Sequence, residues 1–340
     1  MKILGIIVAI ISFLLLVVSH EFGHMMVGKL CGVRVDEFSV GMGPLIFKKQ
    51  GKETQYSLRA IPFGGYCKFN EDEESDDPRA FVNAAWYKRA LILFAGAFMN
   101  LLVCIIILIS VYTYIGSYSP YINTVQPGSP ADKAGIIPTD RILAINDVYY
   151  DDWADIVNAI SSSEGDVKIT FKHSYSNDSN AKEEAYLTPM LEESTGRRII
   201  GVTCRVEHSI KQAAKESFVT CKEYVVETGK ALGRLVTGKA QDDEIVGVVG
   251  IVSIVSDELQ YGIVNVIYLM GIISLNLAVI NLLPFPALDG GRLLFILLEL
   301  ITRNKINKNV EAAVNTAGLM ILLALAVYLI FRDTFNIFVK

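Results

Sequence analysis

The sequence is poor in cysteine, in histidine and in basic charge, and each shortage argues against a class of protein. Its five cysteines are odd in number and show no CxxC spacing, so we interpret them as packing residues, not as metal ligands or a disulfide framework. Lysine and arginine total 31 against 36 acidic residues, and no basic stripe with interleaved aromatic residues occurs. A nucleic-acid partner is therefore not expected.

Apolar sequence, in contrast, is abundant. Of the 340 residues 52% are hydrophobic, and the mean hydropathy is +0.40, which is too apolar for an ordinary soluble enzyme. Four runs are long enough to cross a bilayer: residues 3–27, about 90–114, about 262–283 and about 311–331. A cleaved signal peptide is the alternative for the first run, but no small-x-small cleavage site follows it. The sequence therefore predicts an α-helical polytopic membrane protein with four transmembrane helices.

Lysine and arginine concentrate in two of the loops between these runs. The segment from 29 to 89 carries ten of them, and the short loop from 303 to 308 carries three. Because basic residues favour the cytoplasmic side of a membrane, both loops are expected to be cytoplasmic. The N-terminus, residues 115–261 and the C-terminus are then expected to lie outside.

Residues 117–205 differ in character, because polar residues, turn signals and alternating strand patterns replace the apolar runs. Ser129 followed by Pro130 is typical of a helix start, and Asp152 begins a second helical pattern. Residues 167–171 alternate as a strand does. This segment is therefore predicted to be a folded domain inserted between the second and third membrane helices.

The next segment, residues 206–261, is predicted to be a linker. Apolar residues recur at helical spacing from 210 to 235 among charged ones, which is an amphipathic helical pattern. Such a helix could pack on the inserted domain or lie along the outer membrane surface, and both arrangements stay open. Residues 246–255, rich in glycine and valine, favour neither a helix nor a strand.

The motif His20-Glu21-Phe22-Gly23-His24 ends the first apolar run, in a region where polar side chains are costly. On a helix, His20 and His24 project from one face and can bind one Zn²⁺, while Glu21 lies close enough to act on a metal-bound water. Zinc lowers the pKa of that water to about 7, and a carboxylate can accept its proton during attack on a carbonyl. The motif therefore indicates peptide hydrolysis.

A catalytic zinc usually has three protein ligands, so one more is required. The other two histidines, His173 and His208, lie in the outer segment and are expected to be surface residues. Residues 284–291 contain two prolines and two glycines, which must interrupt the third membrane helix. Irregular backbone at membrane depth survives only where protein or a wet cavity surrounds it, which makes Asp289 a candidate ligand.

Two asparagines, Asn276 and Asn281, add polar groups to the third apolar run. A hydrogen bond between helices is the ordinary explanation for an asparagine in a membrane segment. A role in the metal site stays open for both.

Together, the motif at 20–24 and the segment Asn281-Leu-Leu-Pro-Phe-Pro-Ala-Leu-Asp-Gly-Gly291 resemble the site-2 protease family. The resemblance is specifically to the bacterial regulator-of-sigma-E type, which carries an inserted PDZ domain. Residues 41–44 and 61–66 are similar to the segments that bracket a membrane-associated β-hairpin in that family. The similarity extends over nearly the whole chain.

Residues 125–146 resemble the PDZ domains of bacterial envelope proteases. Thr139 and Asp147 stand where those domains usually have glycine. A PDZ domain can hold a peptide strand at a sheet edge, or it can serve as a steric filter, and the sequence does not decide between these two roles.

The resemblance also implies roles for individual residues. His20, His24 and Asp289 would bind Zn²⁺, Glu21 would be the general base, and Asn281 would hold the substrate backbone or the oxyanion of the transition state. The implied domains are membrane core 1–116 with a hairpin at about 41–68, PDZ domain 117–205, linker 206–261 and membrane core 262–340.

The implied function is that of an intramembrane zinc metalloendopeptidase, which cleaves the transmembrane segments of single-span membrane proteins in regulated intramembrane proteolysis. A pre-trimmed anti-sigma factor or a remnant signal peptide would suit as substrate. We expect a multi-pass monomer in the bacterial cell membrane, with its N-terminus and PDZ domain extracytoplasmic, and with the lipid bilayer and its substrates as partners.

Two alternatives remain. One is a membrane-anchored zinc peptidase that acts on soluble chains and takes its third ligand from a glutamate, for which Glu299 is the nearest choice. The other is a non-catalytic PDZ scaffold, in which loss of Glu21 or Asp289 would be expected.

Overall fold

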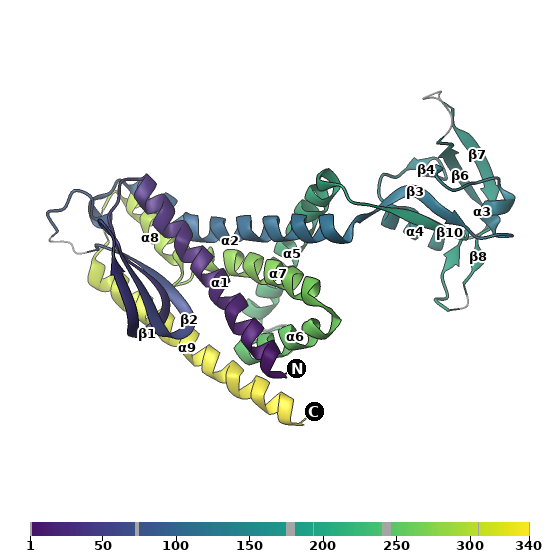
Figure 1. Ribbon diagram of the computed structural model, residues 1–340. Helices are drawn as coiled ribbons and strands as arrows, with labels where there is room; N and C mark the ends of the chain where they lie inside the picture. Colours follow the sequence, from purple (N-terminus) through teal and green to yellow (C-terminus); the bar gives the residue numbers. More distant parts are fainter. Residues whose placement is uncertain are drawn as a thin grey trace. The chain divides into compact units, whose positions relative to one another are not determined.

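The chain divides into two compact units. Tyr112–Ala213 form one, called here the sheet unit, and Met1–Val111 with Ala214–Lys340 form the other, called the helical unit (Figure 1). The computed structural model describes residues 2–71, 75–174, 181–192, 194–239, 246–304 and 306–339.

Within the described residues, four helices are long and apolar enough to cross a membrane, as predicted. They are α1 (Lys2–Leu30), α2 (Trp86–Ile115), α7 (Ile263–Asn281) and α9 (Lys308–Val339). Many of their large apolar side chains are exposed, for example Ile3, Ile106 and Phe331. Apolar surface of this extent on long helices is what contact with lipid requires.

The amphipathic pattern at 210–235 forms a helix, α5 (Ile210–Val236). It packs on two of the membrane helices. The Sγ atoms of Cys221 in α5 and Cys104 in α2 lie 3.7 Å apart, and Thr228 donates a 3.1 Å hydrogen bond to Asn276 in α7. From Ala214 onward α5 belongs to the helical unit. Asn276 has the interhelical role expected of a membrane asparagine.

The glycine- and valine-rich segment also forms a helix, α6 (Val248–Tyr261). Asp333, near the end of α9, accepts hydrogen bonds from the backbone N–H groups of Gly247 and Gly250, at 3.0 and 3.1 Å. These contacts satisfy amides that a helix N-terminus leaves free. Asp333, which is distant in sequence, thus caps the N-terminus of α6, whose own residues favour neither a helix nor a strand.

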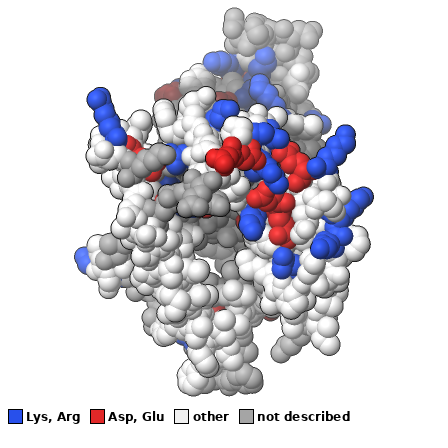
Figure 2. Space-filling model, turned by 90° about the vertical axis from the view of Figure 1, so that its left-hand side faces the viewer, with Lys and Arg blue, Asp and Glu red and all other residues white. Residues whose placement is uncertain are grey.

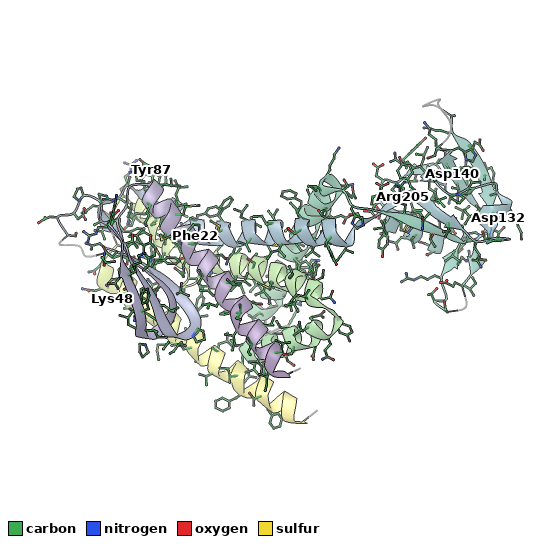
Figure 3. The ribbon with its side chains drawn as sticks, in the orientation of Figure 1. Phe22, Lys48, Tyr87, Asp132, Asp140 and Arg205 are labelled. Carbon is green, nitrogen blue, oxygen red and sulfur yellow. The ribbon has the colours of Figure 1, made fainter. Side chains whose placement is uncertain are left out.

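A long hairpin, β1 (Val35–Gln50) and β2 (Gln55–Phe69), packs against α1 (Figure 1). Its strands bend, so that Phe38 lies opposite both Cys67 and Tyr56. The first part of β1 is therefore an inner strand, and residues 65–69 form one edge of the small sheet. The distal part of β1 is exposed, including Lys48 (Figure 3). After the hairpin, η1 (Phe81–Asn83) leads into α2.

The sheet unit is built on antiparallel strands in the order β10 (Val202–Glu207), β3 (Ser117–Val125), β4 (Arg141–Ile145), β6 (Val167–Lys172) and β7 (Glu183–Leu187). In this sheet β5 (Val148–Tyr149) also pairs with β4, while β8 (Met190–Leu191) and β9 (Arg198–Ile199) form a separate two-stranded sheet. Two helices complete the unit, α3 (Pro130–Lys133) and α4 (Trp153–Ser161). Its core contains Ile122, Ile142, Ile156, Ile169 and Phe171.

Local sequence signals account for both helix starts in the sheet unit. The Ser129 side chain accepts a hydrogen bond from the N–H of Asp132, and the Asp152 side chain caps α4. Thr139 and Asp147 adopt positive φ angles of 77° and 64°. The backbone therefore keeps the left-handed conformation at positions where glycine would be the least strained residue.

The prediction that His173 is a surface residue is wrong. The residue is 8% exposed, and its Nδ1 lies 2.7 Å from an oxygen of Asp140. Asp140 is fully buried and lies in the sheet unit (Figure 3). Hydrogen bonding to Asp140 and the charge of Glu183, 3.2 Å from Nε2, raise the pKa of His173. A carboxylate partner lets the imidazole be buried. His208 is exposed, as predicted.

Candidate metal centre

Three polar side chains that are far apart in the sequence meet inside the helical unit. His20 and His24 come from α1, and Asp289 begins α8 (Asp289–Thr302). The two Nε2 atoms are 3.1 Å apart, and the Asp289 Oδ2 atom lies 3.1 Å from that of His20 and 3.2 Å from that of His24. The structure therefore brings the three predicted ligands together.

The interruption of the third membrane helix positions Asp289. α7 ends at Asn281, and α8 begins only after a tight connection in which Ala287 has a φ of 72°. A Cβ on Gly290 would lie 2.2 Å from the carbonyl oxygen of Leu283. Only glycine fits there, because any side chain would collide with the backbone that folds back over the start of α8.

The donor atoms fit zinc. A tetrahedral zinc with bonds of about 2.0 to 2.1 Å requires ligand atoms about 3.3 to 3.4 Å apart, close to the separations among His20, His24 and Asp289. Asp289 Oδ2 is buried and faces the Nε2 atoms of His20 and His24, which can present lone pairs to the same point. A buried oxygen in that situation favours a cation as its partner.

The hairpin holds Glu21 beside this cluster. Its Oε2 atom accepts a 2.9 Å hydrogen bond from the backbone N–H of Cys67, in the edge segment of β2. Gly65 lies next to the Glu21 side chain, because a Cβ built on it would be 3.6 Å from Cγ. Glu21 is thus positioned by the hairpin, and it is not one of the three clustered residues.

A cavity of about 280 Å³ connects these groups. Asn281 lines it, together with the three candidate ligands and Glu21. Glu299, the alternative third ligand, instead forms a 2.8 Å ion pair with Arg89. The residues that line the cavity are Val17, His20, Glu21, His24, Tyr66, Cys67, Phe69, Leu93, Asn100, Leu277, Asn281, Ala287, Leu288, Asp289 and Arg292.

α2 forms a wall behind the two histidines that the sequence interpretation missed. His24 Nδ1 lies 2.7 Å from the carbonyl oxygen of Ile92, and His20 Nδ1 lies 3.4 Å from the side-chain amide of Asn100. A Cβ on Gly96 would lie 2.3 Å from His24 Nε2. A polar residue and a glycine four apart in an apolar run are the signal that could have indicated this wall.

Two histidines and a carboxylate in one cluster, with a second carboxylate beside them, are the residue set that a metal-dependent hydrolase requires. They lie in a chain that has four helices able to cross a membrane within its described residues. The sequence model of peptidase family M50 matches residues 8–325, and the chain belongs to this family, the site-2 proteases. The resemblance found in the sequence is therefore confirmed, and the protein is a metalloprotease of a zinc-dependent family.

Several curated relatives match this chain over almost their full length. Each bears the name "Putative zinc metalloprotease". The relative from Clostridium acetobutylicum is 34% identical over 98% of this chain and 98% of its own, and the one from Clostridium perfringens is 35% identical over 96% and 98%. The relative from Fusobacterium nucleatum is 31% identical over 97% and 98%.

Solved structures of PDZ domains match about a quarter of the chain. The PDZ domain of the SdrC-like protein from Listeria innocua is 27% identical, covering 26% of this chain and 97% of that one, with a TM-score of 0.23. The corresponding domain from Listeria monocytogenes is 23% identical over 25% and 84%, with a TM-score of 0.22.

Proposed function

We propose that this protein is an intramembrane zinc endopeptidase that cleaves the transmembrane segments of single-span membrane proteins. The observation that carries the proposal is the convergence of His20, His24, Asp289 and Glu21 on one cavity of the helical unit. The first three would hold the zinc. Because α1 is long and apolar, the peptide bond that reaches them would come from a membrane segment.

Zinc, when bound by these residues, would polarise the scissile carbonyl and acidify water. Glu21 would accept a proton from the attacking water and then give it to the leaving amine as the C–N bond breaks. The Cys67 N–H holds the Glu21 carboxylate at the cavity wall, which orients it for both transfers. Asn281 would donate its side-chain N–H to the substrate backbone or to the oxyanion.

A transmembrane substrate must unwind locally, because the carbonyls of a helix are hydrogen-bonded along its own axis. We propose that the hairpin receives the unwound segment as an added strand. Tyr66, Cys67 and Phe69, in the edge segment of β2, line the cavity, which supports this role. The substrate strand would then run beside Glu21.

Chelation and reconstitution provide the direct test. In lipid vesicles the purified protein should cleave a single-span reporter, stop when a chelator removes its metal, and regain activity with Zn²⁺. A soluble chain of the same cleavage-site sequence serves as the comparison. If that soluble chain is cut while the membrane reporter stays intact, the enzyme is a peptidase for soluble chains and the proposal is wrong.

We further propose that the charged end of the helical unit faces the cytoplasm and that the sheet unit is an extracytoplasmic PDZ domain. Acidic and basic side chains gather in the upper part of Figure 2, above a surface with few charges. Arg34 and Asp36 form an ion pair within the predicted cytoplasmic loop, and the pairs Arg292 with Glu71 and Arg89 with Glu299 join this loop to its surroundings. Such charges belong in water beside the membrane.

Cysteine labelling tests this orientation. In a variant without native cysteines, Ser194→Cys in the sheet unit should react with a membrane-impermeant maleimide in intact cells, because its residue is exposed and expected outside. Asp76→Cys, also exposed, should react only after the cells are broken. The reverse pattern would invert the proposed topology.

A further inference from the structure

Whether the Nε2 atom of a histidine can bind a metal depends on the protonation of its other ring nitrogen, Nδ1. A neutral imidazole that offers its Nε2 lone pair to zinc carries its proton on Nδ1, and this N–H needs an acceptor when it is buried. His20 and His24 are 7% and 6% exposed. Their Nδ1 atoms must therefore find acceptors within the protein.

Both Nδ1 atoms face α2, at positions that repeat every four residues. Ile92, Gly96 and Asn100 lie on one side of that helix. The carbonyl oxygen of Ile92 lies 2.7 Å from His24 Nδ1 and can only accept, so this contact already fixes the tautomer of His24. Gly96 provides the space that lets both imidazoles approach α2.

Asn100 takes the corresponding position for His20. Its side chain is fully buried, its amide lies 3.4 Å from His20 Nδ1, and the Ser19 hydroxyl lies 3.2 Å from its other end. Ser274 of α7 donates a 2.8 Å hydrogen bond to the Asn100 backbone carbonyl. Hydrogen bonds with residues of α1 and α7 thus hold Asn100 in contact with His20.

The hydrogen-bond pattern selects one orientation of the amide. The oxygen and nitrogen of an asparagine side chain exchange places by a half-turn, and their assignment follows from the partners. A zinc-bound His20 donates from Nδ1, so Asn100 must present Oδ1 to it and its NH₂ group to Ser19 Oγ. Ser19 can accept that bond, because its own proton goes to the carbonyl oxygen of Leu16 at 2.8 Å.

We propose that Asn100 is a positioning residue of the metal site, which accepts the Nδ1–H of His20 and thereby holds its Nε2 lone pair toward the metal. The inference rests on the zinc site proposed above. The α2 wall then orients the metal ligands as well as packing against them, because the Ile92 carbonyl holds His24 and the Asn100 side chain holds His20. A chain of hydrogen bonds then runs from His20 through Asn100 and Ser19 to the backbone of α1.

Zinc affinity of Asn100 variants tests the proposal. Asn100→Leu preserves volume but removes the acceptor, and it should weaken zinc binding by about 10- to 100-fold, as loss of an outer-shell partner does. Asn100→Asp keeps an acceptor for His20 and should stay within a few-fold of wild type. Affinity is measured on full-length protein by competition with a chromophoric chelator. The visible spectrum of the Co²⁺ form reports ligand geometry separately.

Asn276→Leu is the matched control, because Asn276 also makes an interhelical hydrogen bond, which is partly buried, but lies outside the cavity. It should leave zinc affinity and the Co²⁺ spectrum unchanged. Equal losses in Asn100→Leu and Asn276→Leu would show a packing effect and overturn the proposal, as would equal losses in Asn100→Leu and Asn100→Asp. If the leucine variant does not fold, Asn100→Ala replaces it with the same expectation. Wild-type protein that binds no zinc would instead refute the metal site itself.

Discussion

Replacement of Asp289 by alanine is expected to lower zinc affinity at least about ten-fold, because it removes one of three protein ligands. His20 and His24 remain on α1 in this variant, so weak binding should persist. The change leaves a small polar cavity at the first turn of α8 and should not prevent folding. Zinc content per chain and a chelator competition titration measure the effect on protein purified in detergent.

Asp333→Ala provides the comparison for this experiment. Asp333 is another buried aspartate, 7% exposed, but its carboxylate accepts from the amides of Gly247 and Gly250. Its loss should destabilise the contact between α6 and α9 while the chain still binds one zinc. The variants are compared at a chelator concentration that wild type and Asp333→Ala withstand. If Asp289→Ala also keeps full zinc occupancy there, Asp289 is not a ligand.

The sequence predicts the parts of this structure that depend on local pattern. The four membrane helices follow from uninterrupted apolar runs, whose length is set by the thickness of a bilayer. His20 and His24 share a face because they are four apart on one helix. Asp289 stands out because two prolines shortly before it and two glycines directly after it mark a break in the helix, and such a break is tolerated only around a site or cavity.

Contacts between distant segments are what the sequence does not predict. The group that holds Glu21 is the backbone N–H of Cys67. Every residue except proline has such a group, so the residue type at 67 does not predict this contact. The hairpin is expected at about 41–68, but the sequence does not predict that its inner strand pairs on both sides. This pairing requires both strands to bend, and glycines with positive φ lie at the bends, Gly41 and Gly43 in β1 and Gly64 in β2. Pairing of this kind depends on the whole hairpin.

Polar residues in apolar surroundings are the most informative sequence signals for the site, but they do not identify the partner of each polar side chain. Asn100 and Asn276 look alike in the sequence, because each is a single amide within an apolar helix. Three-dimensional structure separates them, since Asn100 faces His20 and Asn276 faces Thr228. His173 shows the same limit, because its burial depends on Asp140, a partner 33 residues away that no spacing rule identifies.

Glu21→Gln is expected to reduce the rate of peptide cleavage by about 100- to 10,000-fold, the usual effect of removing a positioned base. Glutamine has nearly the same size, and its amide oxygen can still accept the hydrogen bond from the Cys67 N–H. What it lacks is the capacity to take a proton from water. Folding, zinc content and substrate binding should therefore survive while turnover is lost.

His24→Ala should also abolish cleavage, but through a different cause, because it removes a ligand and weakens the metal site itself. Zinc content and cleavage of a single-span reporter are measured in the same preparations of wild type and both variants. Inactive protein with zinc is expected for Glu21→Gln, and inactive protein depleted of zinc for His24→Ala. A Glu21→Gln enzyme that keeps its zinc and cleaves at the wild-type rate would exclude Glu21 as the base, since the proton would then leave the attacking water by another group.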